Sequence, residues 1–189
     1  MPMLLLAGPA VEPWTVADLK SFLRVEHDAD DAVIASLLAA ARSQIEAATC
    51  KMLLTQRWRL VLDAWPRDGR IVLRGGPLRS LIAVRTYDAG GTAHGLDPTS
   101  FVLDLAGGVI ASPSWAPPAP GRTVAGIELD LDLGYGTAPE DVPQPLRHAV
   151  RSLTAHWYDN RGGTGPGDSG AVLPGGIAPL IAGYRAVAL

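Results

Sequence analysis

Three segments of the chain repeat apolar residues at the three- and four-residue spacing of an α-helix. The first follows Thr15, which forms a capping-box pattern with Asp18, and the second ends near Thr49. The third spans residues 142–161 and places these apolar residues on one face: Leu146, Ala149, Val150, Leu153 and Trp157. Prolines suit its first turn, and Gly162 suits its end. The pattern predicts two N-terminal helices and one long later helix.

From Thr55 the spacing changes to the alternation of a β-strand. The alternating residues 57–62, a turn with the sequence PRDG and the apolar residues 71–73 predict a β-hairpin. Further strands are expected at these segments: 82–87, 101–103, 109–110 and 124–133. Turn residues and a proline-rich loop at 112–121 separate them. This region therefore predicts a small, mainly antiparallel sheet.

Together these patterns predict an α+β fold, in which the two N-terminal helices and the long C-terminal helix form a helical layer. A small antiparallel β domain is inserted between them, and an extended tail follows. The expected organisation is as follows: an N-terminal arm and helices at 1–54, a β lobe at 55–136, the long helix at 137–161 packing on the first helices, and a glycine hinge with a docking tail at 162–189.

Composition narrows the function further. With 189 residues, 48% of them hydrophobic, the chain has material for one sizeable core. A net charge of −3 argues against non-specific nucleic-acid binding as the main activity. The lone Cys50 has no internal disulfide partner, which favours a reducing compartment. The apolar run at the N-terminus lacks a basic segment, so we interpret it as a docking arm or frayed end, and no segment approaches membrane length.

Several stretches imitate catalytic or metal-binding motifs. GDSG at Gly167–Gly170 matches a serine-protease signature, but its serine lies in a glycine-rich linker without the rigid surroundings of an oxyanion hole. His148 and His156 lie two helical turns apart, too far for one zinc ion. The cluster of His27 and the aspartates at 28, 30 and 31 lacks the spacing of a calcium loop and suits helix capping. We therefore predict no catalytic residue, cofactor or metal site.

One strand carries an unusual row of charges. In the stretch GIELDLDLG, alternation places Glu128, Asp130 and Asp132 on one face and aliphatic residues on the other. One interpretation is the ordinary solvated face of a half-buried strand. The other is that this face borders a channel through which a polyanion moves, because acidic walls prevent sticking.

The ordered set of segments also resembles a known family. The leading helix pair, the Gly-Pro-Leu step at Gly76–Leu78, the HWYDNR end of the long helix and the final LPGGIAPLIAGYR are together similar to tailed-phage head-tail connector (adaptor) proteins of the phiE125 gp8 type. Relatives of this type also occur in gene transfer agents. The resemblance covers nearly the whole chain.

This resemblance implies a non-enzymatic protein in the neck of a phage or phage-like particle, assembled in the bacterial cytoplasm. It would form a ring of twelve subunits under the portal protein, extend the DNA channel without sequence-specific binding, and contact the next neck or tail protein, a stopper or a tail terminator. The family's portal-docking segment corresponds to these residues: Leu173, Pro174, Ile177, Leu180, Ile181, Tyr184 and Arg185.

Three alternatives remain open from the sequence. An apolar tail after a glycine hinge suits a segment that orders on a partner, but it also suits a tail packed on its own domain. An enzyme would need a polar cluster on rigid elements, and Ser169 is the nearest candidate. The third alternative is a tail-completion or tail-terminator ring protein that binds the tail tube.

Overall fold

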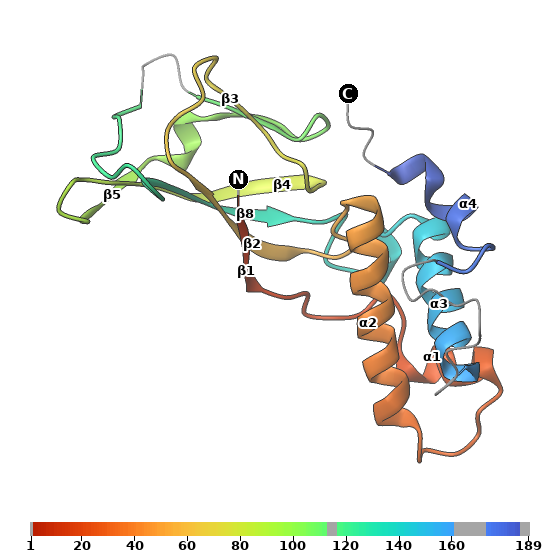
Figure 1. The fold of residues 1–189 in the computed structure, drawn as a ribbon. Helices are drawn as coiled ribbons and strands as arrows, with labels where there is room; N and C mark the ends of the chain where they lie inside the picture. Colours follow the sequence, from red (N-terminus) through yellow and green to blue (C-terminus); the bar gives the residue numbers. More distant parts are fainter. Residues whose placement is uncertain (1, 113–116, 161–172, 186–189) are drawn as a thin grey trace. The chain divides into compact units, whose positions relative to one another are not determined.

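The chain divides into two compact units. Unit 1 comprises residues 1–10 and 55–135, and unit 2 comprises residues 11–54 and 136–189. The structure is a computed structural model, and it describes residues 2–112, 117–160 and 173–185. Strands make up unit 1 and helices make up unit 2, so the predicted α+β class is confirmed (Figure 1).

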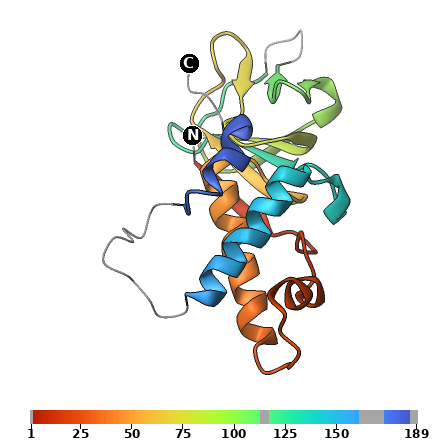
Figure 2. The same cartoon turned by 90° about the vertical axis from the view of Figure 1, so that its right-hand side faces the viewer.

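Unit 2 is a small helical layer. Its α-helices are α1 (Val16–Leu23), α2 (Asp31–Thr49), α3 (Gln144–Asp159) and the short α4 (Ala178–Ile181). Figures 1 and 2 both show α2 and α3 side by side, with α4 near the start of α3. Their facing stripes form the core: Leu19, Ile34, Leu38, Ala41, Ile45, Leu146, Ala149, Val150 and Leu153. The helical spacing in the sequence therefore identified this core.

The ends of these helices follow from local chemistry. The Thr15 hydroxyl accepts the Asp18 N–H at 3.1 Å, and the Asp18 carboxylate accepts the Thr15 N–H at 3.1 Å, which completes the predicted capping box. Pro143 precedes α3, where its missing N–H removes no helical hydrogen bond. Two short 3₁₀ turns, η2 (Pro139–Asp141) and η3 (Ala182–Tyr184), flank α3 and α4.

Unit 1 contains two antiparallel sheets. The larger has the strand order β1 (Met3–Ala7), β2 (Gln56–Leu62), β8 (Ile127–Leu133), β4 (Leu78–Tyr87) and β5 (Ala93–Leu96). The smaller has the order β3 (Arg70–Val72), β7 (Val109–Ala111) and β6 (Val102–Asp104), and a 3₁₀ turn η1 (Pro98–Ser100) precedes β6. Figure 1 shows the smaller sheet above β4 and β8.

The core of unit 1 lies on one face of the larger sheet. Leu129 of the central strand β8 is opposite Leu60 on one side and Val84 on the other, and all three are buried. Ile71 and Ile110 form a buried pair in the smaller sheet. Alternation along each strand therefore sends aliphatic side chains into the core and leaves charged ones on the opposite face of the larger sheet.

Several features differ from the sequence-based expectation, including β5, the start of β4 at Leu78 and the helix α4 in a tail that was expected to be extended. The predicted hairpin of residues 57–62 with 71–73 is wrong, because β2 pairs with β1 and β8, whereas β3 pairs with β7. Alternation shows which face of a strand is buried, but it does not show the strand's partner. Residues 3–7, interpreted above as an arm or frayed end, form strand β1. Three consecutive leucines show no alternation, so the pattern gave no strand signal there.

Candidate functional site

The charged face of the larger sheet in unit 1 is the densest polar arrangement among the sites predicted from sequence. Glu128, Asp130 and Asp132 point to this face, as expected, while the aliphatic residues between them are buried. Asp130 is itself only 5% exposed. A carboxylate with so little access to water needs partners, because burying an unpaired charge is costly.

Arginines on the two neighbouring strands supply those partners. Arg57 meets Asp132 through two hydrogen bonds, of 2.9 and 3.1 Å, and Arg59 meets Asp130 in the same way at 2.7 and 3.1 Å. On the other side, Arg85 Nη1 donates to Asp130 Oδ2 at 2.8 Å. Asp130 is thus held between two guanidinium groups from β2 and β4. The forked geometry of arginine makes such paired contacts strong.

Glu128 completes this network at its other end. Its Oε2 atom accepts the Tyr87 hydroxyl at 2.9 Å and lies 3.2 Å from Arg59 Nη1 and 3.9 Å from Arg85 Nη1. Arg122 lies 5.0 Å from the centre of the Tyr87 ring, a cation–π distance. We call these six charged side chains, three carboxylates and three arginines, the ion-pair face: Arg57, Arg59, Arg85, Glu128, Asp130 and Asp132.

The network shifts the pKa values of Asp130, Tyr87, Arg57 and Arg59. Burial alone would raise the pKa of Asp130, but hydrogen bonds from Arg59 and Arg85 outweigh burial and hold that pKa below its usual value. Burial and the hydrogen bond to Glu128 both raise the pKa of Tyr87. Hydrogen bonds to Asp130 and Asp132 raise the pKa of Arg59 and Arg57 respectively. These shifts keep Asp130, Arg57 and Arg59 charged at neutral pH.

This arrangement neutralises the net charge of the face that carries the acidic residues of β8. The three carboxylates are matched by three arginines, so the ion-pair face is balanced rather than acidic. The sequence revealed the carboxylates, but it did not reveal which strands lie beside them. The alternation of Arg57 and Arg59 in β2 was the available signal. That this face borders a DNA channel stays a prediction.

The predicted docking segment, residues 173–185, lies in unit 2. Ile177 and Ile181 are 3% and 0% exposed, and α4 packs against α3. Arg185 Nε donates to the carbonyl of Ala48 in the last turn of α2 at 3.5 Å, where a cation complements the helix dipole. The remaining predicted anchors are half-buried: Leu173, Pro174, Leu180 and Tyr184. The segment therefore contacts its own unit through two aliphatic side chains and Arg185, and its other predicted anchors stay partly exposed.

The start of unit 2 contains an aromatic contact that sequence analysis missed. Trp14 donates its indole N–H to the Arg147 carbonyl at 2.8 Å. The guanidinium carbons of Arg147 and Arg151 lie 4.2 and 4.8 Å from the centre of the Trp14 ring, and Arg151 also lies 4.4 Å from that of Phe22. This cluster ties the segment before α1 to α3.

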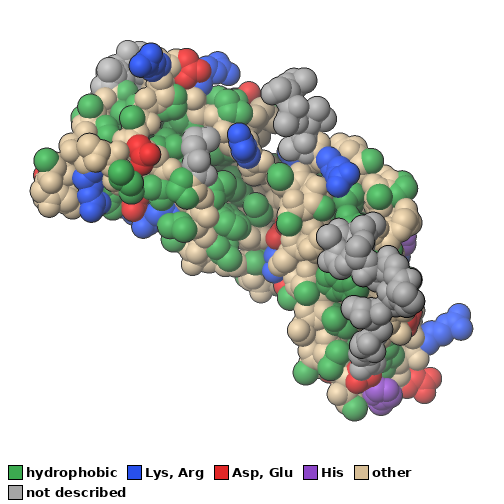
Figure 3. Space-filling view, in the orientation of Figure 1, with side chains coloured by type: hydrophobic (Ala, Val, Ile, Leu, Met, Phe, Trp, Pro, Cys, Tyr) green, Lys and Arg blue, Asp and Glu red, His purple; other side chains and the backbone are tan. Residues whose placement is uncertain are grey.

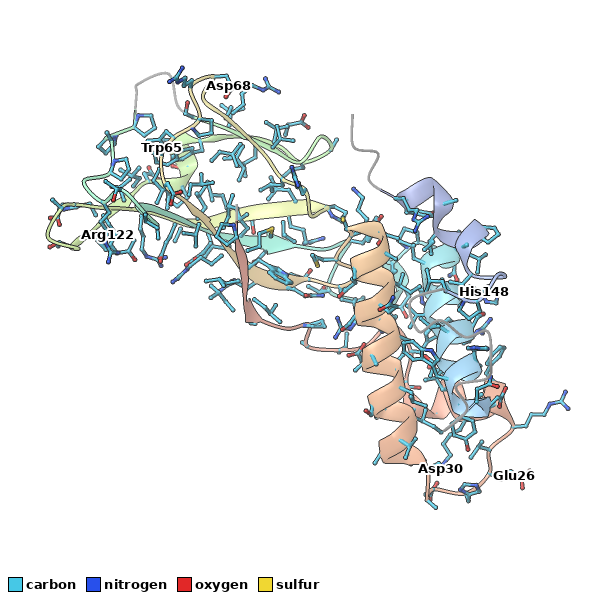
Figure 4. All side chains as sticks on the ribbon, viewed as in Figure 1. Glu26, Asp30, Trp65, Asp68, Arg122 and His148 are labelled. Atoms are coloured by element: carbon cyan, nitrogen blue, oxygen red, sulfur yellow. The ribbon has the colours of Figure 1, made fainter. Side chains whose placement is uncertain are left out.

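The described residues give no support to the catalytic and metal-binding motifs that parts of the sequence resemble. Ser169 and its GDSG stretch lie outside them. His148 is exposed on α3 (Figure 4), where its Nδ1 atom lies 3.1 Å from Arg151 Nη2, and His156 instead contacts Asn160. Within the described part of the chain, no cluster of His, Cys, Asp and Glu could hold a metal ion. None of the helices described there has the length and apolarity that a membrane span requires.

Comparison with known proteins points to one class. Residues 14–70 match the family model of phage gp6-like head-tail connector proteins. The sequence-based resemblance named the phiE125 gp8 type, and both descriptions belong to head-tail connectors. Among curated protein sequences, none matches the chain.

Solved structures extend this similarity over the whole chain. A chain in the neck of an empty gene transfer agent particle, computed with sixfold symmetry, is 28% identical with a TM-score of 0.83, and the match covers 100% of this chain and 97% of that one. A chain in the neck of the native particle, computed with twelvefold symmetry, is 27% identical with a TM-score of 0.80 and the same coverage. A chain in the virion of the native particle is 28% identical over the same shares, with a TM-score of 0.81. These matches agree with the resemblance seen in the sequence: residues 14–70 are similar to head-tail connector proteins, and the whole chain has the fold of the gene transfer agent neck chains.

Proposed function

We propose that the chain forms a ring beneath the portal of a phage or gene transfer agent particle and joins the capsid to the tail. The full-length match to neck subunits of sixfold and twelvefold symmetry is the observation that carries this proposal. A ring of identical subunits needs two different patches on each subunit, one for each neighbour. In such a ring the chain acts as a structural part and extends the channel for DNA.

The portal contact is assigned to the segment from Leu173 to Arg185. The half-buried Leu180 and Tyr184 remain available to a partner, whereas Ile177 and Ile181 hold the segment on unit 2. Docking would therefore add contacts to a segment that is already placed, which lowers the entropy lost on binding. Many identical segments around one portal multiply a weak contact.

A pull-down from a particle-producing lysate tests this contact. Tagged full-length chain should capture the portal protein, and a variant with Tyr184→Ala and Leu180→Ala should capture much less. Val124→Asp is the control, because Val124 is 71% exposed and lies in unit 1. Equal capture of the portal by both chains would contradict the assigned segment. Capture of the tail-tube protein instead would favour the tail-completion alternative, which the comparisons do not favour.

The ion-pair face is the second part of the proposal, as the surface that borders the DNA channel. A balanced face neither attracts phosphates strongly nor repels them, so DNA passes without sticking. Removing one carboxylate would leave an arginine free to bind phosphate. Asp132 suits this test because its partner Arg57 has a side chain that is 45% exposed.

DNA transfer by particles carrying Asp132→Asn tests the channel placement. We expect slower or incomplete transfer at normal particle yield, with a stronger effect at low salt. Glu26→Gln is the matched control, because Glu26 is an exposed acid in the loop between α1 and α2 (Figure 4). Normal transfer by the Asp132 variant would place this face away from the DNA.

A further inference from the structure

An exposed aliphatic strip forms one edge of the larger sheet. Leu4, Leu5 and Leu6 of the edge strand β1 are 53%, 52% and 44% exposed. Leu4 is opposite Arg59 and Leu5 is opposite Trp58, so neighbouring leucines emerge on different faces of this edge. The space-filling view shows hydrophobic side chains in the region where Figure 1 places β1 (Figure 3). Soluble proteins usually protect such an edge with charged side chains, and a strip of leucines is instead typical of a contact surface.

An apolar groove lies towards the opposite edge of the same sheet. On the side of β4 that faces away from β8, the edge strand β5 pairs only with Val84–Tyr87. Among the described strands, none pairs with the Leu78–Ala83 half of β4 on that side. A groove of about 300 Å³ opens beside this half, with Leu81, Phe101, Leu103 and Leu105 in its lining. Leu105 is 50% exposed, so the groove has an accessible apolar rim.

The two patches are alike in chemistry, because both expose aliphatic side chains. One is a strand edge with three exposed leucines, and the other is a groove with a mainly apolar lining, to which Arg79, Ser80 and Thr99 also contribute. Because they lie towards opposite edges of one sheet, the two patches are placed to contact two different neighbours. This is the head-to-tail arrangement that builds rings.

We propose that the Leu4–Leu6 strip of one copy packs into the Leu81–Leu105 groove of the next copy in the ring. This interface rests on the proposed ring function, and it names the residues that join the subunits. A second copy is the occupant that accounts for both patches at once, whereas a different neck protein would have to fit one patch and leave the other open. The sixfold and twelvefold symmetry of the similar neck structures supplies the repeated neighbours that this contact needs.

Cross-linking in purified particles tests the interface directly. In a Cys50→Ser background, the double variant Leu5→Cys with Leu105→Cys is treated with a short bifunctional maleimide. We expect a ladder of dimers, trimers and larger multiples of this chain, and only monomers from either single variant. Homodimers from the Leu5→Cys single variant would show a symmetric contact and overturn the proposal. A cross-link to another particle protein would assign the strip to that protein and also overturn it.

The same experiment separates failure of the interface from failure of the function. If the chain is present in particles and gives no ladder, the interface is wrong while the neck function stands. If the wild-type chain is absent from purified particles, the proposed function fails, and the interface fails with it.

A second pair of variants guards against a cross-linker that reaches distant residues. Leu5→Asp and Leu105→Asp should each lower the amount of this chain per particle by roughly tenfold or more, because each places a charge in an apolar contact. Val102→Asp is the control, since Val102 is 66% exposed and lies next to the groove residue Leu103 but points to the opposite face of its strand. Circular dichroism of the purified full chains checks folding. Wild-type amounts of both folded aspartate variants in particles would overturn the proposal.

Discussion

The helical unit and the β unit place their charges differently. In unit 2 the core is apolar, and charged groups cap helices, form ion pairs such as Arg42 with Glu46, or stack on aromatic rings as Arg147 does on Trp14. In unit 1 one face of the sheet is a network of arginines and carboxylates that joins three strands, with Asp130 at its centre. The bridging pairs are 71 and 45 residues apart in the sequence. The position of each helix is thus set by local spacing and capping residues, whereas the strand partners of this sheet are set by residues far apart in the sequence.

Removing a central aliphatic side chain should have the largest effect in either unit. Leu129→Ala in β8 and Leu153→Ala in α3 each open a cavity in a fully buried site, so each should lower the free energy of unfolding by about 2–5 kcal/mol. Urea denaturation measures the loss. Hydrogen exchange should show faster opening mainly in the unit that carries the change. Equal loss of protection in both units from either variant would contradict the division into two cores.

The aromatic cluster of unit 2 should follow in size. Trp14→Ala removes two cation–π contacts and the hydrogen bond to the Arg147 carbonyl, so we expect a loss of about 2 kcal/mol. Trp14→Phe keeps an aromatic face and should lose only about 1 kcal/mol. Thermal or urea denaturation of the two variants measures this difference. If both variants lose the same stability, the stacked arginines contribute nothing.

Substitutions in the ion-pair face should lower stability more where the carboxylate is more buried. Asp130→Asn weakens contacts with two arginines at a buried position and should cost about 2 kcal/mol. Asp132→Asn weakens a more exposed pair and should cost less than about 1 kcal/mol. Urea denaturation at constant salt distinguishes them. A larger loss from Asp132→Asn would mean that burial does not set the strength of this network.

The smallest effect concerns pH. The folded state holds the pKa of Asp130 below its ordinary value, so the ionised carboxylate stabilises the fold. This stability is fully present above the ordinary pKa near 3.8 and is lost as the pH falls through the lower pKa of the folded state. Asp130→Asn should therefore show a shallower loss of unfolding free energy than the wild type below about pH 4. Identical acid profiles would show that Asp130 gains no net stabilisation from its partners.

The contrast between the units also explains what the sequence could predict. The capping box of Thr15 and Asp18 and the apolar stripe of α3 are local patterns, and the structure confirms both. The partner of β2 was predicted wrongly, because alternation gives the buried face and leaves the partner strand undetermined. The sequence also did not predict that arginines pair with Glu128, Asp130 and Asp132, because the strands beside β8 were undetermined. Strand β1 was missed because its leucines project from both faces of an edge.

The most direct test of the neck function is electron microscopy of particles from a producing strain that lacks this chain. We expect DNA-filled heads without tails together with separate tails, and restoration of complete particles when the chain is supplied from a plasmid. Complete, tailed particles in the absence of the chain would contradict its role as the connection between head and tail.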